Sequence, residues 1–253
     1  MMATFYHPGH PCDNLYRAYR MRKLHRGGNV SNGNKSTLAQ LEAQLRKDPG
    51  AGPLLRMAER VARREGAFGL LGDFLANAVL AVSRDRKLEL CMKLGNLYRD
   101  DIGFHEEAAR WYLQAVEEGP KKSRAFEALV PLCDETGQWE ILVEALLLRA
   151  NIVSEEAPGL KRQAALLRLD NSDEPESAIT LFEDVFELEP GDPVAAEVLV
   201  NHYGNTEQWR KLATVYEGLL TTTEDPADRV ELLKKLALLR ETVIEDTGAA
   251  ARN

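Results

Sequence analysis

Apolar side chains recur at the spacing of amphipathic helices along most of the chain after residue 36. The clearest stretch, residues 87–118, contains two such series separated by a polar break at residues 100–103. Apolar residues that follow one another at intervals of three or four form one face of an α-helix. The pattern therefore predicts two helices joined by a short turn. Their apolar faces are Leu88, Cys91, Leu94, Leu97 and Tyr98 in the first helix, and Ala108, Tyr112, Ala115 and Val116 in the second.

The pattern repeats along the chain. Trp139 and Trp209 lie in similar segments 70 residues apart, and Ala108 and Ala178 have the same separation. Half of this offset, about 35 residues, is the length of one helical hairpin in many repeat proteins, where each hairpin packs on the next. The predicted units are 53–86, 87–122, 123–158, 159–192 and 193–226, with a partial unit at 227–253.

Residues typical of helix ends lie between the predicted helices. Asp-Pro pairs at 192–193 and 225–226 place a side-chain acceptor before a proline at the first helical position. Small residues inside the units predict points where neighbouring helices approach closely. We expect this approach at Gly95, Ala108 and Ala178, with Tyr112, Phe182 and Tyr216 filling the space between helix pairs.

Unit 87–122 resembles the tetratricopeptide repeat, whose pattern is W-x2-L-G-x2-Y, then A-x3-F, then P. The matching residues are Cys91, Leu94, Gly95 and Tyr98, then Ala108 and Tyr112, then Pro120, with cysteine in place of the usual tryptophan. The resemblance covers about residues 53–253 and implies an all-α fold, a right-handed superhelical solenoid of antiparallel helix pairs. A related helical-hairpin repeat is the alternative, because other units carry Leu142 and Leu212 where a small residue is expected.

The resemblance also implies a function, since proteins of this family bind peptides or proteins along a concave face lined by the first helix of each unit. A carboxylate-clamp site is not supported, because Ala128, Leu160 and Ala164 stand where that site needs polar or basic side chains. Residues expected to face the groove are polar and net acidic as a group. They are Met92, Asn96, Arg99, Glu127, Asp134, Gln163, Asp170, Glu197 and Asn201, for each of which plain solvent exposure is the alternative.

Charge is distributed unevenly along the chain. Residues 1–35 carry a net charge of +5, residues 36–86 carry +2 and the remainder carries −15, giving −8 in total. We therefore predict a flexible basic arm at 1–35 and a repeat domain at 36–253. An acidic body repels phosphate groups, so a nucleic-acid ligand is not expected. A regulatory subunit of an enzyme complex and a helical-repeat RNA-processing factor are the alternatives to a non-catalytic scaffold for protein–protein interaction.

Groups that could support catalysis or metal binding have simpler interpretations. His7, His10, Cys12 and His25 lack the spacing of a standard zinc site. The glycine-rich segment 28–36 lacks the phosphate-loop spacing and is interpreted as a linker before a helix that begins at Ser36. Cys91 and Cys133 lie on apolar helix faces and are expected in the core. We therefore expect no catalytic residues, no metal and no cofactor.

The C-terminal segment predicts a helix over residues 227–246 and the start of a second helix at Asp246. Part of its apolar stripe is expected to be uncovered, which favours self-association or docking of a partner there. The stripe consists of Leu232, Leu236, Leu239 and Val243.

No signal-like or membrane-spanning stretch is evident, and three unpaired cysteines favour a reducing compartment, so a cytoplasmic location is expected.

Overall fold

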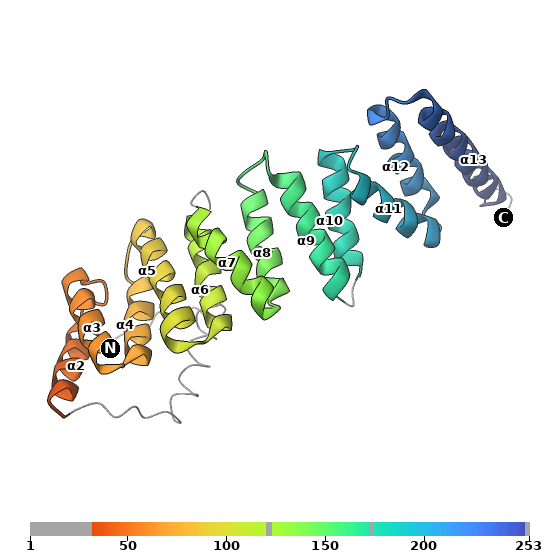
Figure 1. The fold of residues 1–253 in the computed structure, drawn as a ribbon. Helices are drawn as coiled ribbons and strands as arrows, with labels where there is room; N and C mark the ends of the chain where they lie inside the picture. Colours follow the sequence, from red (N-terminus) through yellow and green to blue (C-terminus); the bar gives the residue numbers. More distant parts are fainter. Residues whose placement is uncertain (1–31, 120–122, 173–174, 251–253) are drawn as a thin grey trace. The chain divides into compact units, whose positions relative to one another are not determined.

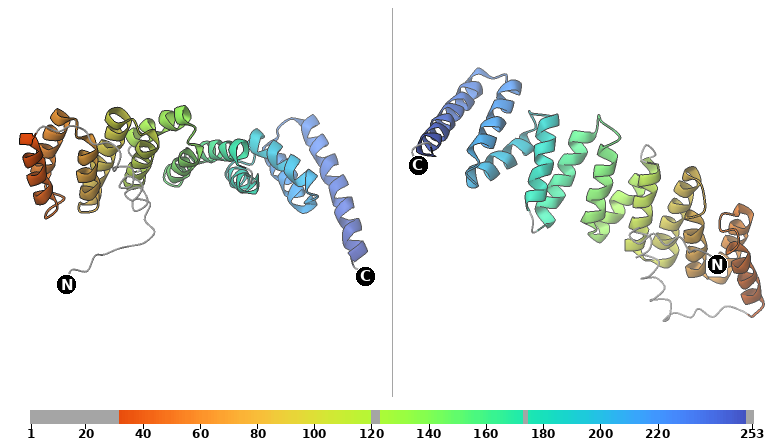
Figure 2. Two further views of the ribbon diagram at one scale, coloured as in Figure 1. Left: turned by 90° about the horizontal axis from the view of Figure 1, so that it is seen from below. Right: turned by 180° about the vertical axis from the view of Figure 1, so that it is seen from behind.

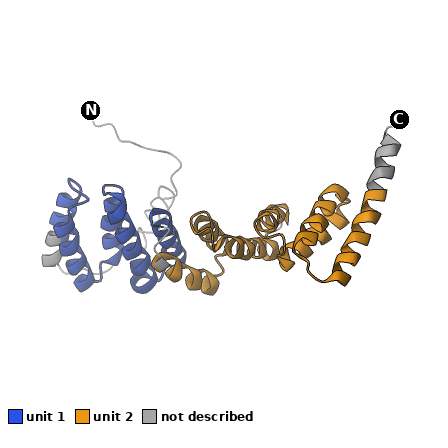
Figure 3. Ribbon diagram, turned by 90° about the horizontal axis from the view of Figure 1, so that it is seen from above, with its two compact units in different colours: residues 1–119 blue, residues 120–253 orange. Residues whose placement is uncertain are grey.

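The computed structural model describes residues 32–119, 123–172 and 175–250, which form helices and connecting turns without a β-strand (Figure 1). The predicted all-α class is therefore confirmed for this part of the chain. Helices that follow one another in the sequence pack side by side within each unit (Figure 2). The chain divides into two compact units, residues 1–119 and 120–253, which are coloured separately in Figure 3.

The first unit contains five α-helices and one short π-helix among its described residues. The π-helix follows α5 directly and is capped by Gly103, the residue after its last one, whose backbone φ of 76° is left-handed. The polar break predicted at residues 100–103 therefore falls within and just after this wide turn. The elements are α2 (Asn32–Leu45), α3 (Gly52–Glu65), α4 (Phe68–Val79), α5 (Arg84–Asn96), η2 (Leu97–Ile102) and α6 (His105–Glu118).

The second unit contains seven helices among its described residues, and each packs on the helix that follows it. Asp192 is the N-cap of its α11 helix, as predicted, because the carboxylate accepts a hydrogen bond from the backbone amide of Ala195 at 2.8 Å. The helices are α7 (Ser123–Thr136), α8 (Trp139–Ala150), α9 (Ala157–Asn171), α10 (Pro175–Leu188), α11 (Pro193–Asn205), α12 (Trp209–Thr222) and α13 (Pro226–Ala250).

Helix bounds differ from the sequence prediction at both ends of the described chain. Helix α2 begins at Asn32 and includes residues assigned to the basic arm, because a nucleated helix extends by a turn at little cost. Residues 1–31 of that arm lie outside the described residues. The second helix predicted from Asp246 is wrong, since α13 continues unbroken to Ala250. Gly248 disfavours the helix by only about 1 kcal/mol, and nothing else in this segment stops it.

Two turns that lie 70 residues apart have the same hydrogen bonds. In residues 136–139 and 206–209, the threonine hydroxyl donates to a carbonyl oxygen one helical turn earlier, at 2.6 and 2.7 Å. The glutamine side chain then donates to the threonine hydroxyl at 2.7 and 3.0 Å. Each turn ends at a half-buried tryptophan that begins the next helix. The sequence repeat is therefore also a repeat of local structure.

These two turns differ at one position, where Gly137 is replaced by Glu207. Both residues have a left-handed backbone, with φ of 68° and 57°. A side chain at such an angle crowds the backbone, and glycine does not. We expect Glu207→Gly to raise the free energy of unfolding by about 0.5–1 kcal/mol. Urea unfolding will measure this, with Gly137→Glu as the reciprocal variant, expected to lower stability by about 1 kcal/mol. Destabilisation by Glu207→Gly would contradict the backbone argument.

Large aromatic side chains occupy the predicted positions between helices. Tyr112 and Phe182, 70 residues apart, are both completely buried, and so are Ala108 and Ala178. A Cβ added to Gly95 would lie 2.4 Å from the Tyr112 ring, so this glycine is needed for close approach of α5 and α6. The small and large residues of the repeat therefore have the packing roles that their spacing predicts. Tyr216, by contrast, is only half-buried.

Candidate functional site

The residues predicted to face a binding groove lie on successive first helices of the predicted units. Most of them are solvent-exposed, and Met92 and Arg99 are half-buried. Exposure makes these side chains accessible to a partner, but it does not bring them together into a pocket. In the first unit, Met92 and Asn96 lie on α5 and Arg99 on η2; in the second, Glu127 and Asp134 lie on α7, Gln163 and Asp170 on α9, and Glu197 and Asn201 on α11.

Two of these residues, Asn96 and Arg99, contact the buried Tyr112 in the first unit. The hydroxyl of Tyr112 donates to Oδ1 of Asn96 at 2.7 Å. The Arg99 guanidinium lies 5.8 Å from the centre of the Tyr112 ring and bonds Asp100 at 2.7 Å. The hydrogen bond to Asp100 raises the pKa of Arg99, and the same bond lowers the pKa of Asp100. Asn96 and Arg99 therefore accommodate a buried tyrosine, a role that sequence spacing alone did not indicate.

The C-terminal stripe is largely covered by the chain itself. Leu236 and Leu239 are 5% and 9% exposed, and Leu232 is half-buried, on a helix that packs against α12. Leu236 and Leu239 are therefore covered, on the face turned towards α12. Val230 and Leu233, which belong to the same predicted apolar series, are each 50% exposed, so part of the series is uncovered. The side chain of Val243 lies outside the described residues.

The second unit contains a groove of about 550 Å³ that the sequence did not predict. It lies between α10 and α12, and residues of α11 form part of its lining. Its buried members are Phe186, Leu199, Tyr203 and Val215. Most of the exposed area inside is apolar. The lining residues are Glu183, Phe186, Glu187, Pro190, Leu199, Tyr203, Lys211, Thr214, Val215, Glu217, Gly218 and Thr221.

The close packing of α12 on Phe186 depends on a residue without a side chain. A Cβ added to Gly218 would lie 2.6 Å from Cε1 of Phe186 and 2.8 Å from its Cζ. The Phe186 ring therefore lies directly against the backbone of α12 and forms part of the groove wall. A larger residue at Gly218 would displace this ring, because atoms in a packed interior cannot approach so closely.

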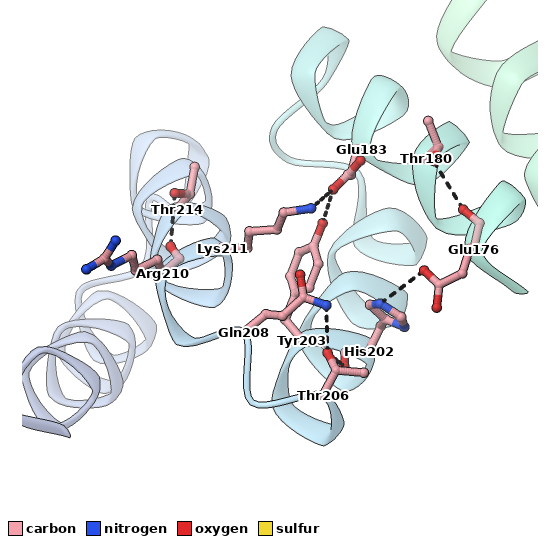
Figure 4. Close-up of polar contacts among 10 residues, drawn as sticks. All are labelled: Glu176, Thr180, Glu183, His202, Tyr203, Thr206, Gln208, Arg210, Lys211 and Thr214. Carbon is pink, nitrogen blue, oxygen red and sulfur yellow. Dashed lines mark hydrogen bonds and ion pairs between the residues drawn. The ribbon is translucent and has the colours of Figure 1, made fainter. Parts of the chain in front are cut away.

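A polar cluster of Glu183, Tyr203 and Lys211 lies on three helices at the groove (Figure 4). The Tyr203 hydroxyl donates a hydrogen bond to the Glu183 carboxylate. Lys211 Nζ lies 2.9 Å from the same carboxylate oxygen and 5.3 Å from the centre of the Tyr203 ring. One carboxylate from α10 thereby joins a hydroxyl from α11 and an ammonium group from α12.

Protonation within this cluster follows from its geometry. Burial raises the pKa of Tyr203, and the hydrogen bond to Glu183 raises it further. Burial would also raise the pKa of Glu183, but hydrogen bonds from Tyr203 and Lys211 outweigh it, and the pKa is lowered overall. At neutral pH the carboxylate is therefore ionised, the phenol keeps its proton, and the charges of Glu183 and Lys211 cancel. The cluster holds three helices together and has no proton poised for transfer.

We expect Glu183→Gln to lower the free energy of unfolding by less than about 1 kcal/mol at pH 7, because the carboxylate is partly solvated. Its folded-state pKa lies below the ordinary value of 4.5, so this contribution is present above pH 4.5 and is lost as the pH falls through the folded-state pKa. Urea unfolding at about pH 7 and about pH 3 will measure the difference. Glu187→Gln on the same helix is the control and should change little at either pH. An equal loss at both pH values would exclude the ionic explanation.

Nucleophilic and metal-binding groups are not organised into a site in the described part of the chain. Cys91 and Cys133 are buried and form no disulfide, and burial with the nearby Asp134 charge raises the pKa of Cys133 to about 12. His202 Nε2 lies 3.8 Å from the exposed carboxylate of Glu176, at the edge of the cluster (Figure 4). Among the described residues no group of three or more His, Cys, Asp or Glu side chains could hold a metal ion. The histidines at 7, 10 and 25 and Cys12 lie outside them.

Comparison with known proteins does not identify the chain. No model of a protein family matches it, and no curated protein matches it either. No helix in the described residues combines the length and apolar character needed to cross a membrane.

The groove and the predicted first-helix surface lie on opposite sides of α11. Leu199 and Tyr203 line the groove, whereas Glu197 and Asn201 precede them by two residues each. A separation of two residues rotates a side chain by about 200° around an α-helix. The groove does not follow from the repeat pattern, because its walls are α10 and α12, the second helices of their units. The one signal for it in the sequence was a glycine inside α12, Gly218, where a residue without a side chain indicates close approach of a neighbouring helix.

Proposed function

We propose that this chain is a non-catalytic scaffold that binds a protein or peptide partner, and that the groove between α10 and α12 is a docking surface. The observation that carries this proposal is an apolar groove of about 550 Å³ whose polar neighbours already bond one another. Grooves of this size, apolar inside with few polar groups, are typical of binding sites. The exposed first-helix residues from Glu127 to Asn201 are a second candidate surface of the same scaffold.

Binding accounts for the groove better than catalysis does. Catalysis would require an activated nucleophile or a general acid or base that can reach a bound substrate. Cys133 is buried with a raised pKa, and Glu183 is ionised and neutralised by Lys211. What the groove offers a ligand is apolar contact area, which stabilises association without chemistry.

Charge supports a protein partner over RNA. Residues 120–253 contain 14 lysine and arginine residues and 26 aspartate and glutamate residues, a net charge of −12. A phosphate backbone would be repelled by this unit at physiological salt. We further propose a tetratricopeptide-like arrangement of the helix pairs, supported by the shared turns at 136–139 and 206–209. A cytoplasmic location fits Cys91 and Cys133, which form no disulfide.

Site-specific photo-crosslinking in cells tests the scaffold function and separates its two candidate surfaces. A benzophenone amino acid replaces Thr214 in the groove or Asn201 on the opposite face, both of which are exposed. Cross-linked products identified by mass spectrometry should contain one recurrent protein at Thr214. Recurrent capture at Asn201 alone would move the binding site to the first helices. Absence of a recurrent partner at either position, or a recurrent RNA adduct, would overturn the proposal.

A further inference from the structure

We infer that the groove between α10 and α12 recognises a basic peptide segment that inserts apolar anchor side chains between the two helices. This inference rests on the proposed scaffold function and specifies the chemistry of its ligand. It combines three observations: an apolar floor without open hydrogen-bonding groups, an acidic rim, and an acidic helix along one wall.

The floor of the groove presents hydrophobic surface without unpaired polar groups. Phe186, Leu199 and Val215 are 9%, 1% and 3% exposed and supply its buried apolar atoms. The Thr214 hydroxyl donates to the Arg210 carbonyl at 3.2 Å (Figure 4). The Thr221 hydroxyl likewise donates to the carbonyl of Gly218 at 2.6 Å. A ligand group that enters this space gains little from being polar, so the anchors must be apolar.

The rim of the groove is acidic. Glu187 is exposed and has no ion-pair partner among the described residues, while Glu217 is paired with Arg240 at 2.8 Å. That ion pair is solvent-exposed, with 49% and 62% of the two side chains accessible, and is therefore weak enough to be exchanged. Glu183 is already neutralised by Lys211. A lysine or arginine beside an inserted anchor would lie near Glu187 and Glu217.

The wider charge around the groove is also acidic. Helix α10 carries four acidic side chains and no lysine or arginine, although Asp184 is paired with Lys161 at 2.7 Å, and the unit that contains it has a net charge of −12. An excess of one charge around a cleft attracts an oppositely charged ligand and accelerates its association. An acidic peptide would meet repulsion from the rim and from α10. The acidic residues of α10 are Glu176, Glu183, Asp184 and Glu187.

Three fluorescent model peptides test this inference with the full chain. The first combines leucines at helical spacing with lysines; the second replaces lysine by glutamate; the third keeps the lysines and replaces leucine by serine. We expect the leucine–lysine peptide to bind at least about ten-fold more tightly than either of the others in fluorescence anisotropy. Its affinity should fall as NaCl rises from about 50 to about 500 mM, because salt screens the rim charges.

A matched pair of variants locates the binding. Glu187→Lys reverses a charge at the groove rim, and Glu197→Lys makes the same change on the opposite face of α11. Both positions are exposed on helices, so neither variant should impair folding. We expect Glu187→Lys to weaken binding of the leucine–lysine peptide by about five-fold, and Glu197→Lys by less than about two-fold. The benzophenone at Thr214 should cross-link this peptide.

Several outcomes would overturn the inference. These are tighter binding of the leucine–glutamate peptide, equal binding of the serine–lysine peptide, and equal effects of the two variants. A failure of the peptides to bind, while the Thr214 benzophenone still captures a recurrent protein in cells, would reject the ligand chemistry and leave the scaffold function standing. Absence of both peptide binding and protein capture would reject both.

Discussion

Phe182→Ala is expected to lower the free energy of unfolding by about 3–5 kcal/mol, the largest effect of any single substitution considered. The Phe182 side chain is completely buried on α10, which packs between α9 and α11. Removing the ring takes away apolar surface and leaves a cavity that two rigid helices cannot close. Urea unfolding followed by circular dichroism will measure the loss, and the unfolding midpoint should shift without loss of helix signal in the native baseline.

Leu188→Ala on the same helix is the control for this variant. Its side chain is 53% exposed, so the change should alter stability by less than about 0.5 kcal/mol. Comparison of the two variants separates the effect of lost burial from the effect of alanine on helix propensity, because both introduce alanine into α10. Equal effects would mean that Phe182 does not pack between the helices as described.

Asp192→Ala is expected to lower the free energy of unfolding by about 2–4 kcal/mol. The carboxylate is 1% exposed, caps α11 through the amide of Ala195, and accepts a hydrogen bond from Arg162 of α9. Alanine removes the cap and separates a buried ion pair. Because 37% of the Arg162 side chain is exposed, the guanidinium can regain water, which keeps the loss below that of a fully buried pair. Thermal and urea unfolding will both report it.

Asp225→Ala provides the matched comparison, since residues 225–226 repeat the Asp-Pro start of residues 192–193. Asp225 is exposed, and its carboxylate lies 3.4 Å from the amide of Asp228. We expect a loss of no more than about 1 kcal/mol. Asp192→Asn should fall between the two aspartate-to-alanine variants, because asparagine can still cap the helix but carries no charge. If Asp192→Ala and Asp225→Ala cost the same, the ion pair with Arg162 contributes nothing.

The helices and their buried faces could be predicted from the sequence, because the same spacing of apolar residues recurs in every unit. The 70-residue offset placed Ala108 with Ala178 and Tyr112 with Phe182, and each pair is equally buried. The cap at Asp192 followed from residue type and position alone. The end of α13 could not be predicted in the same way, because Gly248 is a weak helix breaker and nothing after it in α13 required a turn. Helix ends without a strong signal are decided by small free-energy differences.

The groove could not be anticipated from periodicity. Its walls come from α10 and α12, and its depth depends on the fit of Phe186 against Gly218, two residues far apart in sequence. Spacing identifies which face of a helix is apolar, but not whether two such faces leave a space between them. The same limit explains Leu236 and Leu239, which are apolar at helical spacing and are covered by α12. Whether an apolar stripe is exposed depends on how the neighbouring helix packs as well as on the helix that carries the stripe.

Consecutive helices make the main packing contacts within each unit, and this has a consequence for how such a chain can change over evolutionary time. Duplication or loss of one helical hairpin at a turn such as residues 136–139 would disturb only the interfaces on either side of it. The remaining hairpins would keep their neighbours and their hydrogen bonds. Gain or loss of a whole hairpin would therefore change the length of such a chain while each remaining hairpin keeps its own structure.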